Sequence, residues 1–123
     1  MIKDKYKGVV VPMVTPVTKE GLIDKEAVIR IINSFVENGV SPLLMGTTGE
    51  GNSVSPDQSL ILVKTAIDAA QKRITIYVWL NGCSYKQHVE SANEYQKQGA
   101  DVIVATLPSY YALTDEQMYN YYK

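Results

Sequence analysis

The chain has 123 residues, 46% of them hydrophobic, and a formal net charge of −1. This length suits one domain spanning residues 1-123, and the apolar content is enough for a buried core, which excludes a disordered chain. Acidic and basic side chains are interspersed without a basic stripe, which argues against a nucleic-acid partner. The only cysteine, Cys83, excludes a disulfide framework within the chain and suits a reducing compartment.

The longest apolar run, residues 8–14, is far too short to span a bilayer and contains Pro12. Lysines at positions 3, 5 and 7 precede this run, as they would in a signal peptide, but no cleavage site of small residues follows it. We therefore expect a cytoplasmic protein with no membrane partner.

The first half of the chain predicts two units of a strand followed by a helix. Residues 9–11 form a β-branched apolar run and predict the first strand. Asp24 is placed to cap a helix that ends at residues 38–39, an Asn-Gly pair. The second strand is predicted at residues 43–45. Residues 55–58 then combine a capping box with proline at the first helical position, which predicts the start of the second helix.

The second half repeats this pattern. Residues 74–79 predict the third strand, and a capping box at residues 84–87 starts a helix that ends at a Gln-Gly pair, residues 98–99. Residues 102–105 predict the fourth strand. A further capping box at residues 114–117 starts the last helix.

The strand starts lie roughly 30 residues apart, which is room for a strand and a returning helix. Nearly all-apolar strands are typical of parallel sheets, so the fold class is α/β. An open doubly wound sheet that binds a nucleotide carries a glycine-rich turn after its first strand, whereas residues 14–17 read Val-Thr-Pro-Val. Polar residues and glycines instead follow every strand, which favours a (β/α)8 barrel. They are Thr15, residues 46–50, residues 81–82 and residues 109–111.

A barrel requires eight strand–helix units, and this sequence predicts about four. We therefore expect residues 1-123 to be the first half of a (β/α)8 TIM barrel, the N-terminal part of a single domain, apparently truncated. A four-stranded sheet has two open edges, so the chain alone is expected to self-associate.

The most informative motif is the loop after the second strand, residues 45–51, Met-Gly-Thr-Thr-Gly-Glu-Gly. Gly46 and Gly49 are expected to let the backbone take conformations closed to other residues. Thr47 and Thr48 add hydroxyl donors beside backbone N–H groups, so the loop can cradle an anion. The loop holds no lysine or arginine, which favours a carboxylate over a large phosphate group. The alternative is a glycine-rich turn that merely reverses the chain.

Other single residues predict no second chemistry. His88, the only histidine, falls in the first turn of a helix, where we expect a surface position. One histidine and one cysteine make no metal site. Glu50 is expected to accept backbone N–H groups and to fix the shape of the loop. Tyr119, Tyr121 and Tyr122 are expected to cover the outer face of the barrel or a subunit contact.

Three segments carry a resemblance to a known family: residues 46–50, the Thr15-Pro16 turn and residues 108–111, Pro-Ser-Tyr-Tyr. Over essentially its whole length, the chain resembles the N-terminal portion of the dihydrodipicolinate synthase / N-acetylneuraminate lyase family of pyruvate-dependent class I aldolases. The resemblance implies a (β/α)8 barrel that assembles as a homo-oligomer, a dimer or tetramer. It also implies chemistry without an organic cofactor or a metal.

In this family a lysine on the sixth strand forms a Schiff base with pyruvate, and that strand lies beyond this sequence. The resemblance implies that Thr47 and Thr48, with Gly46 and Gly49, hold the pyruvate carboxylate. It implies that Thr47 also belongs to a proton relay with two tyrosines. One relay tyrosine follows the fourth strand and falls on Tyr110, or on the next residue, Tyr111, if the register slips by one.

The lysines in the chain lie on predicted helices or beside loops, so none is a candidate for the Schiff base. As given, the chain is therefore expected to be inactive by itself. For the full-length protein the resemblance implies a lyase. The synthase branch, which condenses pyruvate with aspartate semialdehyde in lysine biosynthesis, fits first. The alternatives are the neuraminate lyase branch, a 2-keto-3-deoxy sugar-acid aldolase, and a non-catalytic half-barrel.

The sequence departs from the family after the third strand. Dihydrodipicolinate synthases tend to carry a small glycine-rich run there, whereas residues 79–83 read Trp-Leu-Asn-Gly-Cys. Trp79 is bulky and falls near the barrel mouth, so we expect a pocket of different shape.

Overall fold

The structure is a computed structural model that describes residues 4–108 and 111–123. Strands and helices alternate along the chain after a short 3-10 turn, η1 (Asp4–Tyr6). A second 3-10 turn, η2 (Gly51–Ser53), precedes the second helix. The other elements are β1 (Val10–Pro12), α1 (Lys25–Glu37), β2 (Ser41–Leu44), α2 (Pro56–Ala70), β3 (Tyr77–Trp79), α3 (Tyr85–Gln98), β4 (Val102–Val104) and α4 (Asp115–Tyr122).

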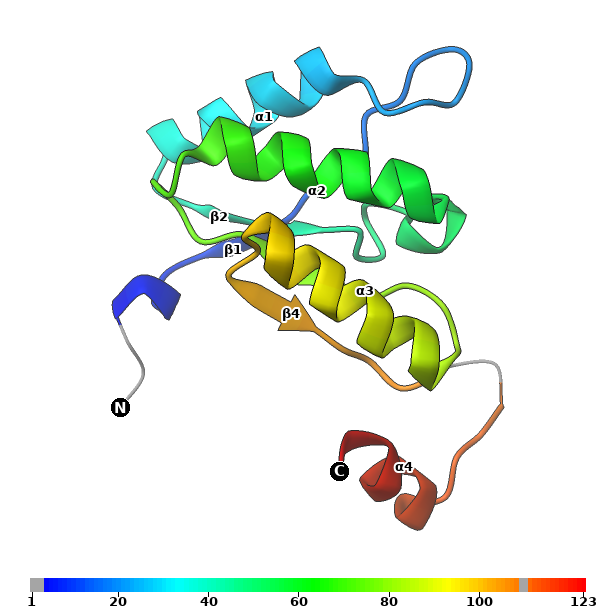
Figure 1. The fold of residues 1–123 in the computed structure, drawn as a ribbon. Helices are drawn as coiled ribbons and strands as arrows, with labels where there is room; N and C mark the ends of the chain where they lie inside the picture. The colour runs from blue at the N-terminus through cyan, green and yellow to red at the C-terminus, as the bar shows by residue number, and fades with distance from the viewer. Residues whose placement is uncertain (1–3, 109–110) are drawn as a thin grey trace.

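The four strands form one sheet in the order β1-β2-β3-β4, and every neighbouring pair is parallel. Figure 1 shows helices α1, α2 and α3 lying along one face of this sheet. Four consecutive strand–helix units with a parallel sheet confirm the predicted fold class. None of the helices in the described part of the chain has the length and apolar character needed to cross a membrane.

The hydrophobic core lies between the sheet and the helices. Val28 and Ile32 of α1 and Val63 of α2 are fully buried there. Leu44 of β2 and Val78 of β3 meet them from the sheet, at 1% and 0% exposure. Successive side chains of a strand point to opposite faces. Their neighbours within the strands, Leu43, Tyr77 and Trp79, therefore point away from the helices.

Two of the predicted helix caps are confirmed. The Asp24 side chain accepts a hydrogen bond from the Ala27 amide at 3.0 Å. At the start of α4, the Thr114 hydroxyl accepts from the Gln117 amide, and the Gln117 side chain accepts from the Thr114 amide at 2.9 Å. These reciprocal bonds satisfy backbone donors that a helix leaves free at its first turn.

The other two predicted capping boxes do not form, although both helices begin where the sequence predicts. Neither Ser55, before α2, nor Ser84, before α3, makes a side-chain cap hydrogen bond. At α2 the Gln58 side chain instead accepts from the Ile23 amide at 2.8 Å, which ties this helix to the loop before α1. The Gln58 side chain, which a capping box would use at the start of its own helix, is thus bonded to a residue distant in the sequence.

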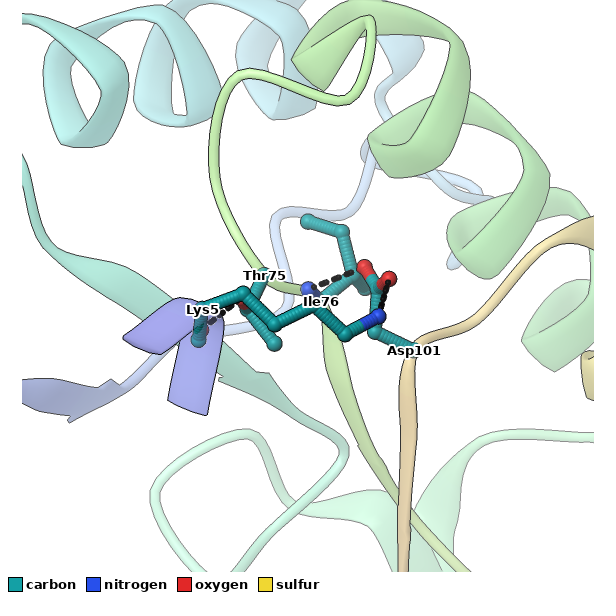
Figure 2. A network of polar contacts seen from close by, with 4 residues as sticks. All are labelled: Lys5, Thr75, Ile76 and Asp101. Carbon is teal, nitrogen blue, oxygen red and sulfur yellow. Dashed lines mark hydrogen bonds and ion pairs between the residues drawn. The ribbon is translucent and has the colours of Figure 1, made fainter. Parts of the chain in front are cut away.

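The third strand is shorter than its apolar run predicts. Ile76, just before β3, donates its amide to a carboxylate oxygen of Asp101 at 3.0 Å instead of to a neighbouring strand. The other carboxylate oxygen of Asp101 accepts from Lys5 Nζ at 3.2 Å, and the Thr75 hydroxyl donates to the Lys5 carbonyl. Figure 2 shows this network, which joins η1 to the amino-terminal ends of β3 and β4.

Candidate functional site

Three of the polar segments predicted to share a site come together at the carboxyl ends of the strands. The Thr15 hydroxyl, after β1, donates to the Gly49 carbonyl at 2.6 Å. The Asn81 side chain, after β3, donates through Nδ2 to the Gly51 carbonyl at 2.6 Å. The turn after β2 is therefore fastened from both neighbouring strands, at the Gly49 and Gly51 carbonyls.

The glycines of this turn have a different role from the one that the sequence predicts. Neither Gly46 nor Gly49 has a positive φ. The left-handed residues are Met45, with φ 59°, and Glu50, with φ 49°. Because Met45 leaves the extended conformation, β2 ends one residue earlier than predicted. Two non-glycine residues therefore make the sharp bends, at a conformational cost that neighbouring contacts must offset.

Glycine is required here because the backbone packs closely. A Cβ built on Gly49 would lie 2.8 Å from the Met13 carbonyl oxygen. One built on Gly51 would overlap the Met45 carbonyl oxygen. At Gly46 a Cβ would meet only side-chain atoms, at an ordinary distance of 3.5 Å. Gly49 and Gly51, rather than Gly46, are thus the glycines that the turn needs.

The turn leaves its two threonines open. Its own hydrogen bonds run from the Glu50 amide to the Thr47 carbonyl at 3.1 Å and from the Gly51 amide to the Gly46 carbonyl at 3.3 Å. Thr47 and Thr48 are exposed, and neither hydroxyl has a hydrogen-bond partner in the described part of the chain. Two hydroxyl donors at a rigid turn can bind a small anion.

A hollow of about 330 Å³ opens beside this turn. It is lined by the loops after β1 and β2, with Thr15, Thr48 and Gly49 in its wall. Thr47 is not one of its lining residues. Of the two threonines, Thr48 is therefore the one placed to contact a molecule in the hollow.

Two larger hollows lie at the ends of the strands, elsewhere on the described surface. One of about 590 Å³ opens at the ends of β3 and β4 and includes Trp79 and Thr106. The other, of about 570 Å³, lies at the opposite ends of the strands and is bordered by Lys72 and Arg73. The first shares the carboxyl edge of the sheet with the threonine turn. The second does not.

The remaining site predictions fall at the loop after β4. Tyr110 lies outside the described residues, so its relay role stays a prediction. Tyr111, the alternative, is described and is 77% exposed.

Glu50 is exposed, and within the described residues its carboxylate makes no hydrogen bond. The loop-fixing role predicted for Glu50 belongs to Thr15 and Asn81.

The surface position predicted for His88 is wrong. Its side chain is only 4% exposed, and Nε2 lies 3.0 Å from the Gly82 carbonyl oxygen. A carbonyl only accepts, so Nε2 carries the proton and Nδ1 accepts from the Tyr121 hydroxyl. Burial is the main cause that raises the pKa of Tyr121, and Tyr122 adds to it. The pair fastens α4 to α3 and takes no part in the threonine turn.

Metal chemistry has no candidate residues in the part of the chain that the structure describes. No group of three or more His, Cys, Asp or Glu side chains lies close enough to hold an ion there. Cys83 is exposed and is not bonded to another cysteine. What the described site offers is hydroxyl and amide donors.

The strands are parallel and follow one another in sequence order, the returning helices cover one face, and polar loops lie at the carboxyl ends of the strands. This arrangement defines a protein of the βα-barrel class. Residues 5–123 match the model of the Dihydrodipicolinate synthetase family, and the chain belongs to that family.

Curated relatives agree with this assignment. The chain is 32% identical over 122 residues to the 4-hydroxy-tetrahydrodipicolinate synthase of Bradyrhizobium diazoefficiens, covering 98% of this chain and 41% of the relative. It is 31% identical over 119 residues to the enzyme of the same name from Persephonella marina, covering 96% and 40%. The chain thus spans about two fifths of the length of these relatives.

Solved structures confirm the fold. The dihydrodipicolinate synthase of Aquifex aeolicus superposes with a TM-score of 0.89 at 27% identity, over 96% of this chain and 40% of that one. The chloride-inhibited enzyme of Acinetobacter baumannii, solved with pyruvate, gives 0.87 at 30% identity, over 94% and 40%. The four units correspond to the N-terminal half of the barrel in this family.

Proposed function

We propose that this chain supplies the carboxylate-binding part of a Schiff-base aldolase, and that the complete enzyme is a 4-hydroxy-tetrahydrodipicolinate synthase that condenses pyruvate with aspartate semialdehyde. The observation that carries the proposal is the turn after β2, where Thr47 and Thr48 stand open on a backbone fastened by Thr15 and Asn81. The names of the relatives support the choice of reaction. Residues 1-123 then form the N-terminal part of one barrel domain.

The chemistry divides between this turn and a lysine elsewhere in the barrel. In the reaction, the lysine amine adds to the keto carbon of pyruvate, and water leaves to give the Schiff base. Loss of a methyl proton gives an enamine, whose carbon attacks the aldehyde. The amino group of the aspartate semialdehyde portion then attacks the imine carbon and displaces the lysine amine, which closes the ring of the product and restores the lysine. The role of Thr47 and Thr48 is to hold the pyruvate carboxylate, so that the keto carbon faces the amine.

The 123 residues alone should bind pyruvate without forming a covalent adduct. Lys64, Lys86 and Lys97 lie on helices, and each pairs with a helical carboxylate. Lys72 follows the end of α2 on the basal side of the sheet. None of these four is placed at the carboxyl end of a strand, where the turn would present a keto carbon.

The proposal includes a homo-oligomer in the cytoplasm. A monomeric dihydrodipicolinate synthase variant is one of the similar solved structures, with a TM-score of 0.88 at 28% identity. Membership of the family therefore does not fix the number of subunits. Sedimentation of the complete enzyme would measure it directly.

Pyruvate affinity in threonine variants tests the proposed site. We expect ligand-detected NMR to show pyruvate binding to the chain, and Thr48→Val to weaken it roughly tenfold through the loss of one charge-assisted hydrogen bond. Thr65→Val is the matched control, because Thr65 lies on α2 and donates to the Ile61 carbonyl. Equal affinities for the chain and for both Thr48→Val and Thr47→Val would overturn the assignment.

A further inference from the structure

Trp79 is the last residue of β3 and points away from the helices. The preceding residue, Val78, is fully buried in the core between sheet and helices. Alternation along the strand places Tyr77 and Trp79 on the opposite face. In a βα barrel the helices form the outer ring, so this opposite face is the barrel interior. Both residues are half-buried in the described part of the chain.

The strand register puts Trp79 next to the threonine turn. Tyr77 pairs with Leu43, and Val78 pairs with Leu44. Leu44 is the last residue of β2 and is followed by Met45, which begins the turn, just as Val78 is followed by Trp79. Its other neighbour is Val104, the last residue of β4. Trp79 therefore lies at the carboxyl edge of the sheet, at the end of the strand next to the one that the threonine turn follows.

One hydrogen bond fixes the direction of the indole ring. Its Nε1 donates to the Thr106 hydroxyl at 3.1 Å. Thr106 lies two residues beyond Val104, the last residue of β4 and the partner of Trp79 in the sheet. The ring has no other polar hydrogen, so the rest of it presents only apolar surface. The indole thus presents apolar surface at the carboxyl edge of the sheet, with its single donor already used, and it lines the hollow that includes Thr106 and Asn81.

We propose that Trp79 is a specificity-determining residue that limits the side chain of the bound 2-oxo acid to a small group. The inference rests on the proposed function, because it requires the carboxylate of the acid to occupy the threonine turn. From there the carbon chain of the acid extends along the barrel interior past the end of β3. The methyl group of pyruvate fits in front of the indole, and a larger substituent meets the ring.

The test measures the dissociation constants of three 2-oxo acids: pyruvate, 2-oxobutanoate and phenylpyruvate. Ligand-detected NMR on the 123-residue chain reports all three. We expect the unmodified chain to bind pyruvate at least about tenfold more tightly than phenylpyruvate. Trp79→Ala should reduce this preference to less than about threefold, whereas Trp79→Phe keeps the bulk and should retain it.

Tyr77→Ala is the matched control, because Tyr77 is an aromatic residue on the same face, one layer below the strand end. We expect it to leave the preference for pyruvate unchanged. Circular dichroism confirms that each variant is folded. If Trp79→Ala retains the full preference while Thr48→Val weakens pyruvate binding, the role of Trp79 is refuted and the proposed site stands. If the unmodified chain binds no pyruvate, both are refuted.

Discussion

Replacing Gly51 by alanine tests why this turn needs glycine. The added Cβ would overlap the Met45 carbonyl oxygen and lie 2.8 Å from Asn81 Oδ1. The first of these atoms belongs to the backbone, so the collision is not relieved by a side-chain rotation. Overpacking of this kind costs about 1–3 kcal/mol in the free energy of unfolding. In a chain of this size that corresponds to a fall in Tm of roughly 4–12 °C.

Gly46→Ala, five residues earlier in the same turn, is the control for this substitution. Its Cβ would find side-chain atoms at 3.5 Å, and its φ is not positive. We expect its free energy of unfolding to change by less than about 1 kcal/mol in either direction. Thermal unfolding followed by circular dichroism compares the two variants. Equal Tm values would refute the argument that close packing, rather than backbone freedom, selects glycine in this turn.

Two further predictions concern stability away from the turn. Asp101→Ala removes the acceptor of the Ile76 amide and should lower the free energy of unfolding by about 1 kcal/mol. Asp68→Ala removes an exposed carboxylate that pairs with a lysine on α2, and it should lower the free energy of unfolding by less than about 0.5 kcal/mol. Urea unfolding curves compare the two variants. A larger loss for Asp68→Ala than for Asp101→Ala would contradict the network in Figure 2. Burial is the main cause that raises the pKa of Tyr95 and of Tyr121 above the usual value of a tyrosine. The folded chain therefore holds these protons more tightly than the unfolded chain. Their contribution to the free energy of unfolding is complete below pH about 10 and is lost as the pH rises through the raised pKa values. Tyr121→Phe should flatten the fall in Tm above pH 10, and an unchanged pH profile in that variant would argue against the partial desolvation of the Tyr121 hydroxyl.

Local features of the sequence predicted the order of elements well, because their determinants lie within a few residues. Asp24 caps α1 through the Ala27 amide three residues on, and Thr114 is satisfied by a group at the same spacing. The glycines at the ends of α1 and α3, Gly39 and Gly99, take the positive φ that a helix end favours. Such features need no knowledge of the remaining chain.

Features set by distant partners were not predictable in this way. His88 is buried because Tyr121, 33 residues away, covers it. The need for glycine at position 51 arises from the Met45 carbonyl and from Asn81, which belongs to another strand end. The only signal in the sequence for the contact between Gly51 and Asn81 was the presence of an asparagine just after the third strand. Its partner became evident only when the strands were paired in register.

We propose that the turn after β2 binds the carboxylate of pyruvate. Titration of the ¹⁵N-labelled 123-residue chain with pyruvate, followed residue by residue in amide correlation spectra, tests it most directly. We expect the largest shifts at the amides of Thr47, Thr48 and Gly49. Largest shifts at Lys72 and Arg73, beside the basic hollow at the other end of the strands, would contradict it.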